Sequence, residues 1–213
     1  MATPNPHLLP LAALIDECRR AARPSGTAIV GIDGIGGSGK STLANAMRRL
    51  ESTIVIVQMD DFYRGLEPEI PPEVPDEPGA QIDWRRLVRQ VLEPLDREEA
   101  GRYQRFDWDA QELAKWHNVP AGTLVLLEGV YATREELAPL LDLRIWVETP
   151  REASAERGIA RDGEQSRDWW LTQWLADERR YVAQERPADA ADIVVDGTDG
   201  RLIYERGEYV RLR

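Results

Sequence analysis

Few folds accommodate the glycine-rich segment that lies near the start of this chain, between an apolar run and a helix-forming run. Residues 28–32 are typical of a buried strand, and residues 41–47 are typical of a helix. The intervening residues 34–41 have the complete pattern Gly-x-x-x-x-Gly-Lys-Ser. In this context the pattern predicts a loop whose backbone N–H groups face phosphate oxygens, supported by the positive end of the helix. The predicted phosphate-contacting residues are Gly34, Gly36, Gly37, Ser38, Gly39, Lys40, Ser41 and Thr42.

The charge of the chain limits its partners. The 213 residues include 27 basic and 38 acidic side chains, for a net charge of −11. Because an acidic protein repels polyanions, we expect no binding to nucleic acid or to an anionic membrane. A phosphorylated small molecule can still bind where N–H groups and basic side chains gather. Cys18 is the only cysteine, and the N-terminus lacks a basic leader, so we expect a cytoplasmic protein without an intrachain disulfide.

Strand-like runs alternate with amphipathic segments along the chain, which predicts an α/β fold: a parallel sheet with helices on both faces. The length fits a single domain over residues 1–213. Residues 201–213 alternate around Arg206-Gly207, which predicts a C-terminal β-hairpin. That hairpin either covers the protein's own sheet or forms an edge for a homo-oligomer. The expected strands are Thr27–Asp33, Thr53–Met59, Thr123–Glu128, Leu143–Val147 and Asp192–Asp196.

Three other segments have distinctive local patterns. Residues 64–80 contain five prolines and five acids, which predicts a mobile, solvated loop that could close over a substrate. Residues 102–108 fit either a short strand or one arm of a hairpin. Thr133 and Glu136 have the spacing of a capping box and predict the start of a short helix.

Further motifs follow the second, third and fourth expected strands. They are Met59-Asp60-Asp61-Phe62-Tyr63, Glu128-Gly129, and a set of arginines formed by Arg157, Arg161-Asp162-Gly163 and Arg167. With the glycine-rich loop, these motifs resemble the uridine kinase-like family, which also includes phosphoribulokinase and bacterial pantothenate kinase. The resemblance extends from about Thr27 to Gly197. It implies a P-loop NTPase fold with a helical lid at about residues 157–168, and transfer of a phosphoryl group from Mg-ATP to a hydroxyl group.

The resemblance also implies how the reaction is catalysed. Asp60 is the acid that orients and deprotonates the acceptor hydroxyl. We prefer Asp60 to Asp61, because neighbouring side chains in an extended segment diverge. Lys40 reaches the terminal phosphates.

The metal and the transferring phosphate require further groups. Ser41, Glu128 and Asp60 are the predicted ligands of Mg²⁺, since hydroxyl and carboxylate oxygens suit this ion. The guanidinium fork matches phosphate oxygens, so lid arginines would fold over ATP and meet the developing charge. The predicted lid arginines are Arg161, which is assigned a catalytic role, and Arg157 and Arg167, which are assigned to the nucleotide.

Residues 102–109 fall where uridine kinases place part of the nucleoside pocket. The aromatic-Asp pair of that pocket is present as Phe106-Asp107. The His or Arg that nucleoside enzymes carry a few residues later is missing, because Asp109-Ala110-Gln111 occupies that stretch. The acceptor therefore stays open among nucleosides, nucleotides, vitamins and sugar alcohols. The predicted acceptor contacts are Tyr63, Arg105 and Asp107.

Two classes of function fit these motifs. The first is a small-molecule kinase that uses ATP and Mg²⁺. The second, suggested by the missing pocket residue, is a regulatory protein that binds nucleotide and changes shape without phosphorylating an acceptor. A GTPase is disfavoured, because the sequence has no Asn-Lys-x-Asp motif for reading guanine.

Overall fold

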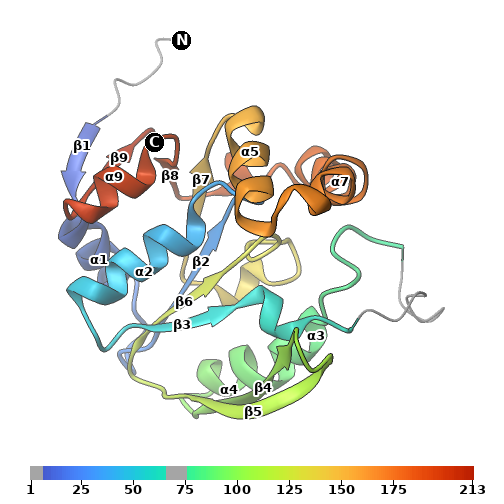
Figure 1. Ribbon diagram of the computed structural model, residues 1–213. Helices are drawn as coiled ribbons and strands as arrows, with labels where there is room; N and C mark the ends of the chain where they lie inside the picture. Colours follow the sequence, from blue (N-terminus) through green and yellow to red (C-terminus); the bar gives the residue numbers. More distant parts are fainter. Residues whose placement is uncertain (1–6, 66–75) are drawn as a thin grey trace.

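A computed structural model describes residues 7–65 and 76–213 of the chain. Its centre is a seven-stranded sheet with the strand order β1-β9-β8-β7-β2-β6-β3 (Figure 1). The strands β8, β7, β2, β6 and β3 pair in parallel. Strand β9 pairs antiparallel with β8 on one side and with β1 on the other. The strands are β1 (His7–Pro10), β2 (Ala28–Asp33), β3 (Val55–Gln58), β6 (Leu124–Glu128), β7 (Leu143–Glu148), β8 (Ile193–Asp196) and β9 (Glu208–Arg211).

The central strands are buried on both faces, which explains their continuous apolar sequences. Successive side chains of a strand point to opposite faces. In β6, Leu124 and Leu126 therefore contribute to one core cluster, and Val125 and Leu127 to the other. The sheet thus separates two hydrophobic layers and holds the carboxyl ends of β2, β3 and β6 close together.

Helices cover both faces of the sheet (Figure 1). Apolar side chains of α1, α2 and α9 fill one core cluster. The other cluster contains side chains of α3, α4 and α7, with a two-stranded hairpin of β4 and β5 packed beside them. These elements are α1 (Leu11–Arg20), α2 (Lys40–Leu50), α3 (Trp84–Leu87), α4 (Glu93–Asp96), β4 (Gly101–Asp107), β5 (Glu112–Val119), α7 (Leu175–Glu185) and α9 (Gly200–Glu205).

Further helical segments cover the carboxyl edge of the sheet or connect strands. Residues 167–185 form one long helical segment that includes a π-helical stretch, Trp170–Trp174. The remaining segments are α5 (Arg151–Asp162), α6 (Arg167–Trp169), α8 (Pro187–Ala190), a π-helical stretch Val88–Leu92, and short 3-10 helices at Met59–Phe62, Ala138–Leu140 and Glu164–Ser166.

Two local expectations need correction, and one open alternative is settled. The C-terminal strands β8 and β9 pair antiparallel, as expected of a terminal hairpin, but the first arm predicted within 201–213 is helix α9. Tyr204 on α9 is buried in the core cluster of α2, so tertiary packing stabilises a helix there. Thr133 starts no helix, because its N–H and hydroxyl bond the carboxylate of Asp33 instead. The ambiguous segment 102–108 forms a hairpin arm, β4.

Other expectations concern burial and mobility. Cys18 is buried, and burial raises the pKa of its thiol to about 12, which is typical of an unreactive thiol. Across residues 7–65 and 76–213, no helix has the length and hydropathy to span a membrane. Most of the proline-rich segment, residues 66–75, lies outside the described residues, so its predicted mobility stays a prediction.

Candidate active site

The phosphate loop connects β2 to α2, as the sequence pattern predicts. Gly39 precedes the helix with φ 105°, a left-handed conformation that glycine adopts without a steric penalty. The Lys40 Nζ atom lies 2.9 Å from the carbonyl oxygens of both Gly34 and Ile35. An ammonium group has three N–H donors. The two loop carbonyls therefore orient Lys40 and leave one donor for a phosphate oxygen.

Helices that follow β7 pack directly onto this loop. A Cβ atom added to Gly36 would lie 2.7 Å from the Trp170 ring and 2.8 Å from Glu178 Oε1. The Gly36 N–H donates to Glu178 Oε1 at 2.7 Å, and the Ser154 hydroxyl donates to the Gly36 carbonyl at 2.5 Å. Trp170 and Glu178 are buried, so solvent is excluded from this contact. The glycine is therefore needed for close packing as well as for the turn.

Asp33 supports the loop from beneath. Its carboxylate is fully buried and accepts hydrogen bonds from the N–H of Gly34 at 2.7 Å and the hydroxyl of Tyr181 at 2.6 Å. Thr133 contributes two more bonds, each of 2.9 Å. Burial raises the pKa of Asp33, while these bonds lower it. This arrangement gives Asp33 a structural role.

Ser41 and Glu128, two of the predicted Mg²⁺ ligands, are in contact with each other. The Ser41 hydroxyl donates to Glu128 Oε2 at 3.2 Å, and the Gln58 amide donates to Oε1 at 3.0 Å. Burial raises the pKa of Glu128, and the nearby charge of Asp60 raises it further. Among the described residues no three His, Cys, Asp or Glu side chains form a metal site by themselves. The donor set fits Mg²⁺ that shares its remaining positions with phosphate oxygens and water.

Asp60 and Asp61 lie in a 3-10 helix after β3, and their environments differ. Asp61 is buried: it accepts a 2.8 Å hydrogen bond from the Tyr103 hydroxyl and lies 3.6 Å from Arg105 Nε. Asp60 is exposed to solvent. The surrounding protein raises the pKa of Asp60 by desolvation, while the charges of Lys40 and Arg161 lower it. Asp61 is thus held by the β4 hairpin, whereas Asp60 lies within range of the charge of Lys40.

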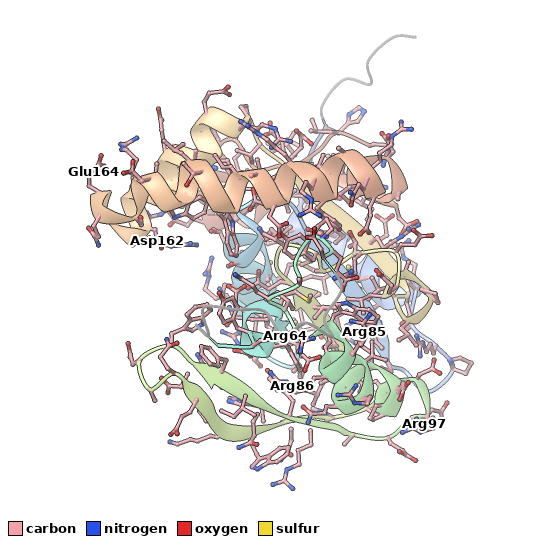
Figure 2. All side chains as sticks on the ribbon, turned by 90° about the vertical axis from the view of Figure 1, so that its right-hand side faces the viewer. Arg64, Arg85, Arg86, Arg97, Asp162 and Glu164 are labelled. Atoms are coloured by element: carbon pink, nitrogen blue, oxygen red, sulfur yellow. The ribbon has the colours of Figure 1, made fainter. Side chains whose placement is uncertain are left out.

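The three lid arginines have three different environments. Arg161 bonds Asp162 at 2.7 Å; this bond raises the pKa of Arg161 most, and the charges of Asp60 and Glu128 raise it further. Arg157 instead donates to the carbonyls of Gly197 and Thr198, beyond β8. Arg167 pairs with Glu164, and Figure 2 shows Asp162 and Glu164 at one end of the long helical layer. Arg161 is thus the lid arginine that faces the carboxylates of the site.

Two adjoining cavities extend from the phosphate loop along α2. One, of about 230 Å³, includes Gly39, Arg157 and Gly197 in its walls. The other, of about 640 Å³, includes Asn45, Arg48 and Arg49. Both are lined by Thr42 and Arg201. Their position beyond the loop, together with the backbone N–H groups and Lys40, fits the remainder of a nucleoside triphosphate.

The three predicted acceptor contacts have different partners, although the Tyr63 ring lies 5.6 Å from the ring of Phe106, which separates Arg105 from Asp107 in the sequence. Tyr63 lines a cavity with Tyr131 and Trp174. Arg105 lies against the buried Asp61. Asp107 accepts hydrogen bonds from the N–H groups of Asp109 and Ala110, both at 3.0 Å, and so caps the turn between β4 and β5.

Comparison with known proteins agrees with this geometry. The sequence profile of the Phosphoribulokinase / Uridine kinase family matches residues 29–199. This chain belongs to that family. A uridine kinase of Ureaplasma parvum is 27% identical over 154 residues, which cover 67% of this chain and 74% of that protein. An inorganic pyrophosphatase of Arabidopsis thaliana is 28% identical over 138 residues, 63% of this chain but only 21% of that protein.

Solved structures show the family fold. A possible uridine kinase from Bacillus stearothermophilus has a TM-score of 0.64 at 21% identity and covers 86% of this chain and 96% of its own. A D-glycerate 3-kinase from Cryptococcus neoformans has a TM-score of 0.57 at 10% identity and covers 88% and 93%. The expected P-loop NTPase fold is therefore confirmed, and membership of the family indicates an ATP-dependent kinase.

Sequence reasoning missed the inward face of α7. Asp177, Glu178 and Tyr181 all point into the site: Asp177 bonds Gly79 and Tyr131, Glu178 bonds the phosphate loop, and Tyr181 bonds Asp33. The spacing of three and four residues is a helical signal that was available. Polar residues at this spacing are usually a solvated helix face, so the signal alone did not indicate burial.

Proposed function

We propose that this member of the family transfers the γ-phosphoryl group of Mg-ATP to a hydroxyl group of a nucleoside-like or other small acceptor. One observation carries the proposal. Lys40, Asp60, Glu128 and Arg161 come from four separate segments, yet the charge of Lys40 lowers the pKa values of Asp60 and Glu128, and the charges of those two carboxylates raise the pKa of Arg161. Two carboxylates and two positively charged side chains beside a phosphate loop are the groups that phosphoryl transfer requires.

Each group has a part in the transfer. Asp60 accepts the proton of the acceptor hydroxyl, whose oxygen forms a bond to the γ-phosphorus while the bond to the ADP oxygen breaks. Lys40 and Arg161 donate hydrogen bonds to the phosphoryl oxygens as charge develops on them. Asp60 is exposed to solvent, so an acceptor can reach it. The products are ADP and a phosphate ester.

Ser41 and Glu128 would hold Mg²⁺, with Asp60 nearby. Bound Mg²⁺ would neutralise phosphate charge in a site that otherwise contains several carboxylates. Without the metal, the same carboxylates would repel the phosphates of ATP. Asp60, Glu128 and Glu178 all lie near Lys40, the side chain that would bind those phosphates. We also expect the enzyme to act in the cytoplasm, where ATP is available and a lone cysteine stays reduced.

The contact between Gly36 and Glu178 favours a second candidate function. A helix that binds the phosphate loop directly could move when nucleotide binds, as in a nucleotide-gated regulatory protein. Such a protein would bind nucleotide tightly but would show no turnover that depends on an acceptor.

The decisive experiment is ADP release from Mg-ATP across a panel of nucleosides, nucleotides, vitamins and sugar alcohols, with Asp60→Asn as the matched variant. Stimulation by an acceptor that disappears in Asp60→Asn would support the kinase. Nucleotide binding without stimulation by any acceptor would contradict it and favour the regulatory function.

A further inference from the structure

A cavity of about 230 Å³ lies beside the phosphate loop, between residues 76–82, Tyr131 and helix α7. Tyr63 lines it, and the Tyr63 N–H bonds the Asp60 carbonyl at 3.3 Å. On the opposite side Asp177 lines it, and the adjacent Glu178 bonds the phosphate loop. The cavity therefore lies between Tyr63, which is bonded to the segment of the acid, and helix α7, which is bonded to the phosphate loop. We call it the acceptor cavity, a name that depends on the kinase function proposed above.

The uncharged walls of the acceptor cavity are flat and largely aromatic. Tyr63, Tyr131 and Trp174 line it together with Ala80 and Ile82. The Tyr63 ring is fixed from behind by Trp108, with 4.5 Å between the ring centroids, and Tyr131 by Tyr181, with 4.9 Å between centroids. The volume is below the ~300–1,000 Å³ of pockets for drug-sized ligands. These walls suit a small molecule with a ring-shaped body.

The charged walls are mostly acidic. Asp76, Glu77 and Asp177 line the cavity, and Arg180 is the one basic side chain that the described residues contribute. Arg180 is already paired, at 3.2 Å from Asp76 and 3.8 Å from Asp177. A phosphate or carboxylate on the acceptor would therefore meet three like charges and an arginine that two carboxylates already bind.

Nearby arginines do not change this balance, because carboxylates hold them. Glu77 lies 3.5 Å from Arg85 and 3.6 Å from Arg134, and it also accepts a 3.0 Å bond from the Trp84 indole. Arg134 in turn pairs with Glu136 at 2.8 Å. Figure 2 shows Arg85 and Arg86 on the helical segment that begins with α3.

Neutral groups remain for hydrogen bonding to an uncharged acceptor. The Tyr63 hydroxyl donates to Gln81 Oε1 at 2.7 Å, so the orientation of the Gln81 amide is fixed. An amide nitrogen has two donors, which suit hydroxyl or carbonyl oxygens. Asp177 Oδ2 meanwhile accepts from the Gly79 N–H at 2.8 Å and the Tyr131 hydroxyl at 2.9 Å.

From these contacts we propose that the acceptor is an uncharged, ring-shaped hydroxyl compound, and that the enzyme discriminates against analogues bearing a phosphate or carboxylate. The discrimination arises because the acidic walls leave an added anion without a free cation, and like charges brought together in a cleft repel one another.

The test uses pairs of acceptors that differ in one anionic group. They are uridine and uridine 5′-phosphate, ribose and ribose 5-phosphate, and pantothenyl alcohol and pantothenate. Acceptor-stimulated ADP release should show a kcat/KM about 100-fold higher for the uncharged member of a productive pair. Calorimetry with Mg²⁺ and a non-hydrolysable ATP analogue should show the same order of affinities.

The outcomes separate this inference from the proposed kinase function. A preference for the anionic member overturns the inference and leaves the kinase intact. Binding of the uncharged member without turnover overturns the kinase and supports only the preference of the cavity for uncharged ligands. Absence of both binding and turnover for every uncharged member overturns both.

Two variants test the origin of the discrimination. Asp177→Asn retains an oxygen that accepts from Gly79 but removes a negative charge, so the preference for uncharged acceptors should fall about tenfold. Asp76→Asn, at a highly exposed side chain, should act in the same direction with little risk to folding. Arg179→Gln, at an exposed position on the same helix but outside the cavity, is the matched control. An unchanged preference in both aspartate variants would overturn the electrostatic explanation.

Discussion

The phosphate loop and the acceptor cavity differ in how many parts of the chain build them. Residues 34–42 provide the loop as one continuous segment. The acceptor cavity combines Tyr63, residues 76–82, Tyr131 and α7, which are far apart in sequence. Phosphate has the same shape in every nucleotide, so a local backbone motif is sufficient to bind it. Acceptors differ in shape and charge, and the surfaces that distinguish them are assembled by tertiary packing.

Substitutions of Asp60 and Asp61 test the segment that leads from the phosphate site to the acceptor cavity. Asp60→Asn should lower kcat about 1,000-fold, because the acceptor hydroxyl loses its proton acceptor. Asp61→Asn should mainly lower stability by about 1–3 kcal/mol, because the bond from Tyr103 and the contact with Arg105 are weakened. Turnover assays and thermal unfolding distinguish the two effects. Equal kcat losses in two stably folded variants would contradict the assignment.

The sequence predicts the phosphate loop, which is local, better than the acceptor cavity, which distant segments build. The strand, glycine-rich loop and helix form one local pattern, so Lys40 and Ser41 could be placed from it directly. Asp177 and Glu178 could not, because their contacts depend on α7 packing against segments 98 and 142 residues earlier in the chain. Alternation in 201–205 suggested a strand, yet Tyr204 packs against α2 and a helix results. Packing between distant segments outweighs local pattern at such positions.

A substitution of Lys40 tests whether the phosphate loop positions the transferring phosphate. Lys40→Met should reduce kcat about 300-fold, because one positioned donor to the phosphoryl oxygens is lost and the Gly34 and Ile35 carbonyls lose their partner. Lys115, exposed on β5, offers a matched control in Lys115→Met, which should leave turnover unchanged. Full activity in Lys40→Met would show that the loop does not position the transferring phosphate.

Arg161 and Arg167 test which lid arginine meets the reacting phosphate. Arg161→Gln should lower kcat about 100-fold, because it removes a guanidinium near Asp60 and Glu128. Arg167→Gln should have an effect of about twofold or less, because Arg167 pairs with Glu164 on an exposed surface. Steady-state kinetics with saturating Mg-ATP measure both. The opposite order would indicate that the lid rearranges when nucleotide binds.

The pH dependence of kcat gives a smaller but more specific effect. Asp60 must be ionised to accept a proton, so kcat should fall as the pH falls through its pKa, which desolvation raises above the ordinary value. Arg161 lowers the pKa of Asp60. Arg161→Gln should therefore move the acidic limb of the pH–kcat profile to higher pH. A limb that stays in place would show that another group controls it.

Glu178 joins the two regions and should give the smallest effect on turnover. Glu178→Ala leaves the buried Gly36 N–H without a partner, so unfolding free energy should fall by about 1–3 kcal/mol. Nucleotide affinity should weaken about tenfold, because an interaction of about 1.4 kcal/mol that fixes the loop is lost. Glu178→Gln keeps an oxygen acceptor for Gly36 and should recover most of both losses, as calorimetry and thermal unfolding can measure. If Glu178→Gln instead behaves like Glu178→Ala, the negative charge near Lys40, and not the hydrogen bond, holds the loop against α7, and the link between the two regions is electrostatic.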